Sequence, residues 1–345
     1  MRRSWLVLGV VAYLGGLAAV IHAQAVNPPP KVLTPEIRKG LESLYSEAKA
    51  AAVRIETIPE GTGSGFFISA DGLVMTAYHV VRDAASFRVV TTKGQSLPAS
   101  VVGYDEYHDI ALLRAKASGP LPFLELDTSH NPKAGDGVLA IGNSRGEFIA
   151  PRYGLVTSVD RDIFPFFNSV AVSSTLPLAP GDSGGPAINE KGKAVAVVIA
   201  IGVSDGVFES YLSPLYNQDE LLAGLQAGRK HSVPYIGVAL FQIDDDTATL
   251  LKIPKEGVLV RDLLPGGAAQ KAGLRPFVAR IVDGKEVYDF DVILKADGRS
   301  FDDVQELQRY VRSKNVGDTV TLTIRRGKET VEVKVVLAPN PENRT

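Results

Sequence analysis

The decisive stretch of the sequence runs from Gly65 to Val81 and reads GFFISADGLVMTAYHVV. It contains two short apolar segments, a polar turn with a glycine between them, and a histidine after the second segment. Further short apolar segments occur at 87–90, 110–113 and 137–142, with Gly, Pro, Asp or Asn between them. Many short strands separated by turn residues are typical of an all-β barrel or sandwich. The short strands extend from about Val53 to Leu215, and a region of this length favours two small barrels over one sandwich.

A candidate nucleophile lies in the segment Gly181–Pro186, which reads GDSGGP. A nucleophilic serine needs an exposed hydroxyl on a tight turn, and it needs backbone N–H groups aimed at the developing oxyanion. Glycines let the chain bend sharply and approach the substrate closely. We therefore interpret Ser183 as a nucleophile and the amides of Gly181 and Ser183 as the donors of an oxyanion hole.

A serine is a weak nucleophile unless a base accepts its proton, and the base needs a carboxylate to orient it. His79 follows a predicted strand and is the expected base, with His108 as its competitor. Asp109 opens the apolar segment 110–113 and is the expected orienting group, whereas Asp105 is the weaker candidate because we expect it in a polar turn. Side chains alternate along a strand, so His108 is expected to face solvent.

The order His79, Asp109, Ser183 resembles that of the chymotrypsin-like serine proteases. More narrowly, the chain resembles the high-temperature-requirement (HtrA/Deg) family, and the matching strings are Gly63–Phe66, Gly72–Val81, Asp109–Leu113, Ala140–Asn143 and Pro180–Pro186. Tyr235–Val238 and Ala268–Leu274 are similar to PDZ motifs, with room for one such domain. The resemblance implies an all-β, chymotrypsin-like double β-barrel followed by an α+β PDZ domain.

The expected parts of the chain are a signal peptide or membrane anchor at 1–25, a linker and N-terminal helix at 26–51, the protease domain at 52–228, a linker at 229–234, the PDZ domain at 235–338, and a C-terminal tail at 339–345. Thr34 is the expected N-cap of the helix. Two arginines, an apolar run at 4–21 and the small-x-small site Ala23-Gln24-Ala25 are typical of a cleaved secretory signal. An uncleaved run would instead tether the protein to a membrane through residues 4–21. Either way we expect export, to the periplasm or the extracellular space.

The resemblance also implies roles for residues outside the triad. The backbone around Tyr235, Ile236, Gly237 and Val238 would bind the C-terminal carboxylate of a peptide, which would then pair with the strand from Val238. Pro177 stands where an acidic residue would select Lys or Arg, so we expect an apolar substrate pocket that accepts small or medium aliphatic residues. The expected pocket residues are Pro177, Leu178, Ile199, Ala200 and Ile201.

Three features need a separate interpretation. Asp182 stands where the family usually has asparagine, and we interpret it as a simple substitution. The segment Arg275–Phe290 is an insertion in the expected PDZ domain. The segment 164–167, which reads FPFF, lies in a loop between strands, where it either packs or belongs to a regulatory or substrate-contacting loop.

Composition excludes several other classes of protein. The chain has 345 residues, no cysteine and a formal net charge of −2. The lack of cysteine excludes disulfides, thiolate catalysis and cysteine-based zinc sites. The lack of a long basic run argues against nucleic acid as a partner. We expect neither a metal nor a cofactor.

These observations favour an extracytoplasmic serine endopeptidase that hydrolyses peptide bonds through an acyl-enzyme. The resemblance implies unfolded or misfolded polypeptides as substrates in protein quality control, C-terminal peptides as PDZ ligands, and a homotrimer or larger homo-oligomer. Two alternatives stay open: a membrane-tethered regulatory protease, and a PDZ-directed chaperone or scaffold with little proteolysis.

Overall fold

The computed structural model describes residues 32–59, 61–144, 148, 151–164, 167–204, 207–301 and 303–339. The expected signal or anchor at 1–25 and residues 340–345 of the expected tail lie outside the described residues. Within the described ranges, no helix is long and apolar enough to cross a membrane.

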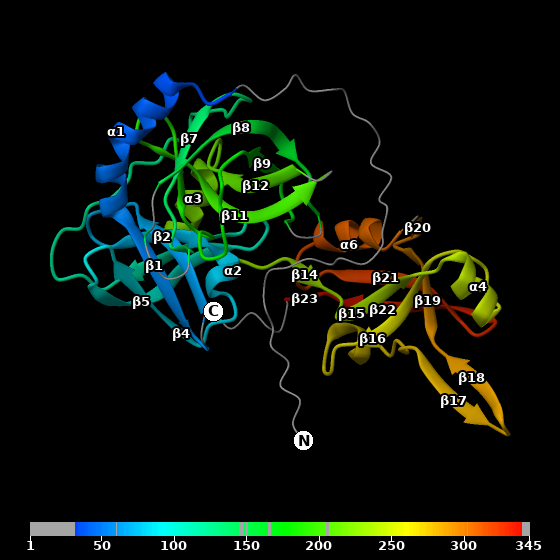
Figure 1. Cartoon of the computed structure of the whole chain (residues 1–345). Coiled ribbons are helices and arrows are strands. Elements are labelled where there is room, and N and C mark those ends of the chain that lie inside the picture. The colour runs from blue at the N-terminus through cyan, green and yellow to red at the C-terminus, as the bar shows by residue number, and fades with distance from the viewer. Residues whose placement is uncertain are drawn as a thin grey trace.

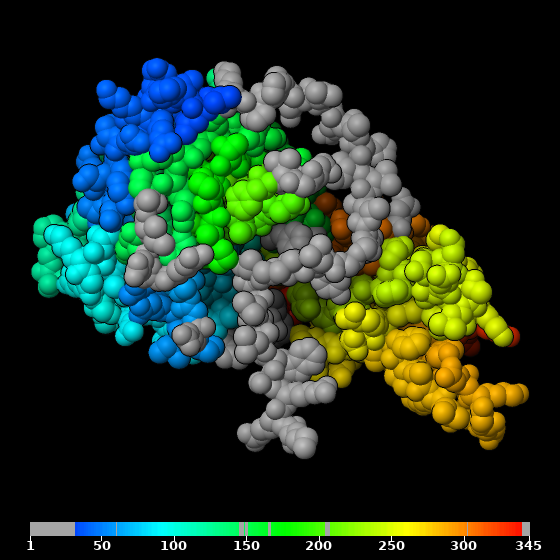
Figure 2. All heavy atoms as spheres, in the orientation of Figure 1, coloured from blue at the N-terminus to red at the C-terminus, as the bar shows by residue number. Residues whose placement is uncertain are grey.

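The first described element is helix α1 (Pro35–Ala51), and it begins where the sequence predicts. The Thr34 side chain accepts a hydrogen bond from the Ile37 amide at 3.3 Å, which confirms the predicted N-cap. The apolar face of the helix buries Leu41 and Ala48 against the body of the protein. In the space-filling view the residues of α1, in blue, lie against the green residues of the following domain (Figure 2).

A first β-barrel follows the helix. Its six strands are β1 (Ala52–Ile58), β2 (Gly61–Phe67), β3 (Leu73–Ala77), β4 (Ser86–Thr91), β5 (Ser96–Asp105) and β6 (Ile110–Ala115). The hydrogen-bonded order is β5-β4-β1-β2-β3-β6, and the pairing of β5 with β6 closes the barrel. The short helix α2 (Tyr78–Val81) directly follows β3. Its start therefore lies beside the start of β6, because Ala77 pairs with Ile110.

A second closed barrel has the strand order β10-β11-β12-β9-β8-β7. Its strands are β7 (Gly137–Ala140), β8 (Arg152–Arg161), β9 (Ala171–Ser174), β10 (Pro186–Ile188), β11 (Ala194–Ser204) and β12 (Val207–Pro214). Helix α3 (Asp219–Gln226) follows and packs against β5 and β6 of the first barrel. The predicted double β-barrel is therefore confirmed.

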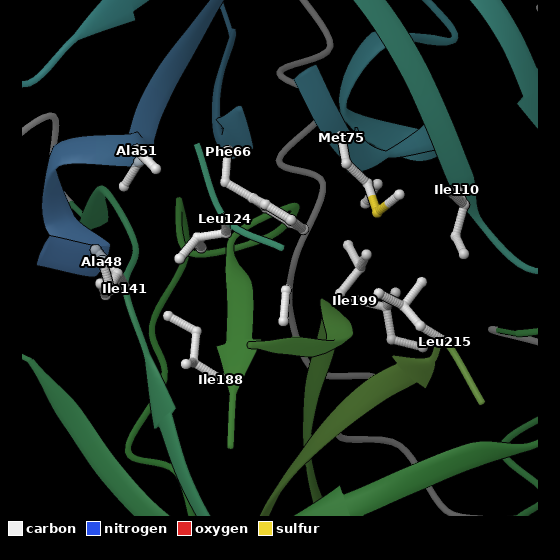
Figure 3. Packing of buried hydrophobic residues seen from close by; sticks show 14 of the residues in the cluster. Ala48, Ala51, Phe66, Met75, Ile110, Leu124, Ile141, Ile188, Ile199 and Leu215 are labelled. Atoms are coloured by element: carbon white, nitrogen blue, oxygen red, sulfur yellow. The ribbon is translucent and has the colours of Figure 1, made fainter. Parts of the chain in front are cut away.

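The two barrels share one hydrophobic core at their seam. Figure 3 shows Met75 and Ile110 of the first barrel close to Ile199 and Leu215, which come from the second-barrel half of the domain. Met75 and Ile110 have no exposed surface. Each buried aliphatic side chain contributes about 1.5–3 kcal/mol to folding, so this seam fixes one barrel against the other. Residues carried by separate barrels can then meet with a fixed geometry.

The C-terminal domain mixes strands and helices. Its main sheet contains β15 (Val238–Gln242), β16 (Val258–Leu263), β19 (Asp291–Ala296), β21 (Thr319–Arg326) and β22 (Glu329–Val336), with β20 (Arg299–Ser300) paired to β19. Among the described residues, the helices that accompany it are α4 (Asp245–Leu251), α5 (Ala268–Lys271) and α6 (Val304–Arg312). β14 (Pro234–Tyr235) pairs with β23 (Ala338–Pro339), so the beginning and the end of the domain lie side by side.

Two segments of this half of the chain are more ordered than their sequence suggests. Within the linker expected at 229–234, Lys230–His231 forms β13, which pairs in parallel with β5 of the first barrel. The insertion Arg275–Phe290 contains a hairpin of β17 (Val278–Val282) and β18 (Lys285–Asp289). The hairpin projects from the C-terminal domain on the side away from the barrels (Figure 1).

Candidate active site

His79 and Asp109 lie side by side at the end of the β3–β6 pair where β3 ends and β6 begins. His79 is the second residue of α2, and Asp109 directly precedes β6. The Asp109 carboxylate accepts two hydrogen bonds from His79: one from its backbone amide at 2.8 Å and one at 2.6 Å from ring atom Nδ1. The Tyr78 amide donates to the Asp109 carbonyl at 3.0 Å. The imidazole is therefore held in one orientation, which leaves Nε2 as the acceptor of the neutral ring.

The electrostatics of this pair suit a general base. The side chains of His79 and Asp109 are 34% and 16% exposed. Burial alone would lower the pKa of the His79 imidazole, but the charge of Asp109 and its hydrogen bond outweigh burial and leave that pKa above its ordinary value. Asp109 thus stabilises the protonated ring that forms when His79 accepts a proton.

The loop that carries Ser183 lies against the first barrel, although it connects β9 to β10 of the second. The Ser64 amide donates to the Ser183 carbonyl, and Ser64 Oγ donates to the Gly181 carbonyl, both at 2.7 Å. Position 184 must be glycine, because a Cβ atom there would clash with Thr76 Oγ1 and lie 3.0 Å from the Ala77 amide. The loop is thus packed against the end of β3, two residues before His79.

The structure gives no hydrogen bond between Ser183 Oγ and the His79 ring. Catalytic hydrogen bonds are often long in a substrate-free enzyme and tighten when substrate binds. The structure does fix the backbone of each partner, because Ser64 bonds to the Ser183 loop and Asp109 bonds to His79.

The amides of the Ser183 loop fall into two groups. Those of Asp182, Gly184 and Gly185 donate to the carbonyls of Ala179, Val198 and Asp182 at 2.7–3.0 Å. The amides of Gly181 and Ser183 have no acceptor among the described residues. Two unengaged N–H groups on either side of Asp182 can bind an oxyanion in the way that the sequence predicts.

Asp105, the weaker candidate for the carboxylate, has a different place from the expected one. It is the last residue of β5 and is buried, not part of a polar turn. Its carboxylate lies 3.0 Å from the Nδ1 atoms of both His108 and His231. The expectation that His108 faces solvent is also wrong. Its ring packs against Asp105, and only 23% of the His108 side chain is exposed. Pattern reasoning missed the contact because His231 is distant in sequence.

The five expected pocket residues have different environments. Pro177 is exposed, and Ala200 and Ile201 are half-buried. Leu178 and Ile199 are each 5% exposed: Leu178 packs in the core of the second barrel and Ile199 in the seam. The role of the set as a substrate pocket stays a prediction.

A groove lies between the start of the C-terminal domain and helix α6. All four residues expected to bind a peptide carboxylate, Tyr235, Ile236, Gly237 and Val238, line it. The opposite wall comes from α6, with Leu307, Gln308, Val311 and Arg312. Sequence reasoning did not include this wall, although the spacing 307, 308, 311, 312 is that of one helix face.

Two further residues that support the site, Ser64 and Arg152, are absent from the predicted site residues. Ser64 binds Gly181 and Ser183 and also accepts from the Asn143 amide at 2.8 Å. Arg152 forms an ion pair with Asp182 at 3.2 Å. Ser64 could have been found from the string at 63–66, whereas Arg152 has no sequence motif. No group of three or more His, Asp or Glu side chains in the described ranges is placed to hold a metal ion.

Two closed β-barrels with a histidine–aspartate pair beside a glycine-rich serine loop define the class of chymotrypsin-like proteases. Residues 63–197 match the family model of the trypsin-like peptidase domain, and residues 234–337 match that of the PDZ domain. An Arabidopsis thaliana protein named "Protease Do-like 1, chloroplastic" is 30% identical over 88% of this chain and 69% of its own length. The chain belongs to the HtrA/Deg family of serine proteases.

Two other similarities extend this comparison. A Chlamydia trachomatis protein named "Probable periplasmic serine endoprotease DegP-like" is 30% identical over 81% of this chain, and the match spans 54% of that relative's length. The solved structure "HtrA-type protease AlgW with decapeptide" has a TM-score of 0.58 and 21% identity, and covers 87% of this chain and 99% of its own. This likeness agrees with the fold of both domains.

Proposed function

We propose that this chain is an exported serine endopeptidase that hydrolyses peptide bonds through an acyl-enzyme. In this proposal Ser183 is the nucleophile, His79 is the general base and acid, and Asp109 orients the imidazole. The amides of Gly181 and Ser183 form the oxyanion hole. The observation that carries the proposal is the 2.6 Å contact of His79 Nδ1 with the Asp109 carboxylate. The other ring nitrogen of His79, Nε2, has no partner among the described residues, and helix α2, which carries His79, borders the serine loop.

The reaction follows from this arrangement. Ser183 Oγ attacks the carbonyl carbon of the scissile bond while Nε2 of His79 accepts the hydroxyl proton. The carbonyl oxygen becomes an oxyanion between the two amides, and the C–N bond then breaks as His79 gives its proton to the departing amine. Water repeats the sequence on the ester and releases the free serine and the carboxylic acid.

The decisive variant is Ser183→Ala. Triad knock-outs lower turnover by about a millionfold, so casein cleavage by this variant should fall to the background level. The matched control is Ser69→Ala, which changes a serine that bonds only to its own turn. Casein cleavage that survives in Ser183→Ala would sink the proposal, provided that both variants unfold at the wild-type temperature.

We propose misfolded or unfolded polypeptides as substrates and C-terminal peptides as ligands of the groove between β14, β15 and α6. Its apolar wall and the amides of Ile236 and Gly237, which have no acceptor among the described residues, suit a peptide that pairs with β15. An apolar substrate pocket around Pro177, Ala200 and Ile201 would prefer small or medium aliphatic residues. Cleavage of a peptide library with and without C-terminal peptides tests both points together.

We further propose an exported location, periplasmic or extracellular, and a homotrimer or larger homo-oligomer. The pattern of residues 1–25 and the name of the Chlamydia relative support export. The apolar face of α1 is buried against its own barrels, so contacts between copies would use the exposed residues of that helix. The N-terminal residue of the purified protein distinguishes a cleaved signal from an anchor, and sedimentation as a monomer would contradict the trimer.

A further inference from the structure

A charged side chain occupies the middle of the proposed oxyanion loop. Asp182 stands between Gly181 and Ser183, and it is only 1% exposed. A buried carboxylate is costly unless hydrogen bonds and a counter-charge replace the water it has lost. Asp182 is therefore more than a simple substitution for asparagine, because its charge requires a partner inside the protein.

The carboxylate has such a set of partners. Its Oδ1 accepts a hydrogen bond from the Ser144 amide at 3.1 Å, and its Oδ2 accepts from the Ala179 amide at 2.9 Å. The charge is balanced by Arg152, whose Nε lies 3.2 Å from Oδ2 and whose side chain is 19% exposed. A second guanidinium nitrogen of Arg152 donates to Ser144 Oγ. Arg152 thus bonds to both Asp182 and Ser144.

The backbone around this pair leaves little freedom. Arg152 begins β8 and pairs with Ala140 of β7, so it stands beside the turn that contains Gly142 and Ser144. A Cβ atom at position 142 would overlap Asp182 Oδ1 and lie 2.7 Å from Asp182 Cα. The serine loop is therefore packed directly on this turn. A shift of the Asp182 backbone would therefore also move the flanking amides of Gly181 and Ser183.

We propose that Arg152 is a positioning residue: it holds the Asp182 carboxylate in place and so keeps the Gly181 and Ser183 amides aimed at one oxyanion. The inference rests on the proposed function of Ser183. The planar guanidinium suits this task, because it can bond to two groups at once, whereas a lysine would offer a single point charge. Arg152 touches no substrate and acts only through Asp182.

The test is a double-mutant cycle in the full chain with Arg152→Gln, Asp182→Asn and the double variant. Loss of one oxyanion donor costs 10²–10³ in kcat, so Arg152→Gln should lower kcat by about a hundredfold with little change in KM. The double variant removes both charges and keeps amides that can bond, so it should recover most of the lost kcat. Arg114→Gln, which breaks an exposed ion pair with Asp71, is the matched control and should keep the wild-type kcat.

A second readout separates positioning from stability. Affinity for a peptide aldehyde, whose hemiacetal oxygen occupies the oxyanion hole, should fall with kcat in Arg152→Gln. Binding of a C-terminal peptide to the groove at α6 should not change. If Arg152→Gln fails to fold, Arg152→Lys serves instead, and it should lose part of kcat and part of the aldehyde affinity.

The outcomes are distinct. A folded Arg152→Gln or Arg152→Lys with wild-type kcat and aldehyde affinity overturns the positioning role alone. A double variant that stays as slow as Arg152→Gln also overturns it, because the carboxylate would then not be the group through which Arg152 acts. A wild-type protein with no Ser183-dependent hydrolysis overturns the proposed function itself.

Discussion

Asp109 acts on both the backbone and the ring of His79, and this double contact is the strongest constraint on a single residue in the site. Asp109→Asn should lower kcat by about 10⁴-fold, because an amide stabilises the imidazolium less and favours the wrong tautomer. Asp105→Asn is the matched control, since Asp105 also contacts a histidine ring but lies in the β5–β13 contact. Steady-state kinetics that find the larger loss in Asp105→Asn would reverse the assignment.

The raised pKa of His79 determines the pH below which kcat/KM falls, and this fall is the acid limb of the pH profile. The general base must be neutral, so kcat/KM should rise with pH and reach half its maximum above the ordinary imidazole value of 6.5. The Asp109→Asn variant lacks the charge that raises this pKa, so its residual activity should have a limb at lower pH. A wild-type limb at or below pH 6.5 would contradict the electrostatics described for this pair.

At the scale of elements, strand β13 of the linker pairs with β5 of the first barrel, and two titratable groups, His231 and Asp105, lie in contact there. The hydrogen bond that the His231 ring donates to Asp105 raises the pKa of His231 despite partial burial, while Glu106 adds to this effect and Arg229 opposes it. Burial opposes ionisation of Asp105, but hydrogen bonds from His108 and His231 hold its pKa well below the usual range. The contact is therefore strongest when Asp105 is charged and His231 is protonated.

The sign of the pH effect follows from these directions. A raised His231 pKa contributes stability below the ordinary value of 6.5, and that contribution is lost as pH rises through the raised value. Hydrogen-exchange protection of the Tyr104 and Glu106 amides, which donate to Arg229 and His231, should decrease between pH 6 and pH 8. The same comparison in His231→Gln should find no such decrease, and equal pH dependence in both proteins would refute the role of His231.

How far the sequence predicts the elements depends on whether the signal is local. The cap at Thr34, the short strands and the Ser183 loop are encoded within a few residues each, and the structure contains them. The fold of β13 onto β5 and the pair of Arg152 with Asp182 join residues far apart in sequence. No periodicity or motif in the sequence indicates such pairs. They form only because the fold of the barrels brings the residues together. The sequence indicates the position of the insertion at 275–290, but no pattern in it predicts the β17–β18 hairpin.

At the scale of the whole molecule, helix α6 of the PDZ domain contacts the loop between β8 and β9, and the ring of Phe164 lies at this contact. Arg309 and Arg312 of α6 lie over the ring of Phe164, with guanidinium carbons 4.3 Å and 4.9 Å from its centroid. Arg309 also pairs with Asp162 at 2.7 Å, and Arg312 donates to Asn168 at 2.6 Å. Because Arg312 also lines the peptide groove, a ligand there lies one side chain from the protease loop.

This contact predicts coupling between the two domains. Phe164→Ala should reduce the effect of a saturating C-terminal peptide on casein turnover, because two cation–π contacts of about 0.5–2 kcal/mol each are lost. The affinity of the peptide itself, measured by fluorescence anisotropy, should stay near the wild-type value. A variant that loses peptide affinity but keeps the full response to bound peptide would contradict this role of Phe164.

The proposed mechanism depends on the activation of Ser183 by His79, which Asp109 holds in place in the folded chain. The most direct measurement is the mass of the intact protein after reaction with a fluorophosphonate, followed by peptide mapping of the adduct. We expect one adduct, on Ser183, in the wild type, and no adduct in His79→Ala under the same conditions. A wild-type protein without an adduct, or a His79→Ala variant labelled as fast as the wild type, would contradict it.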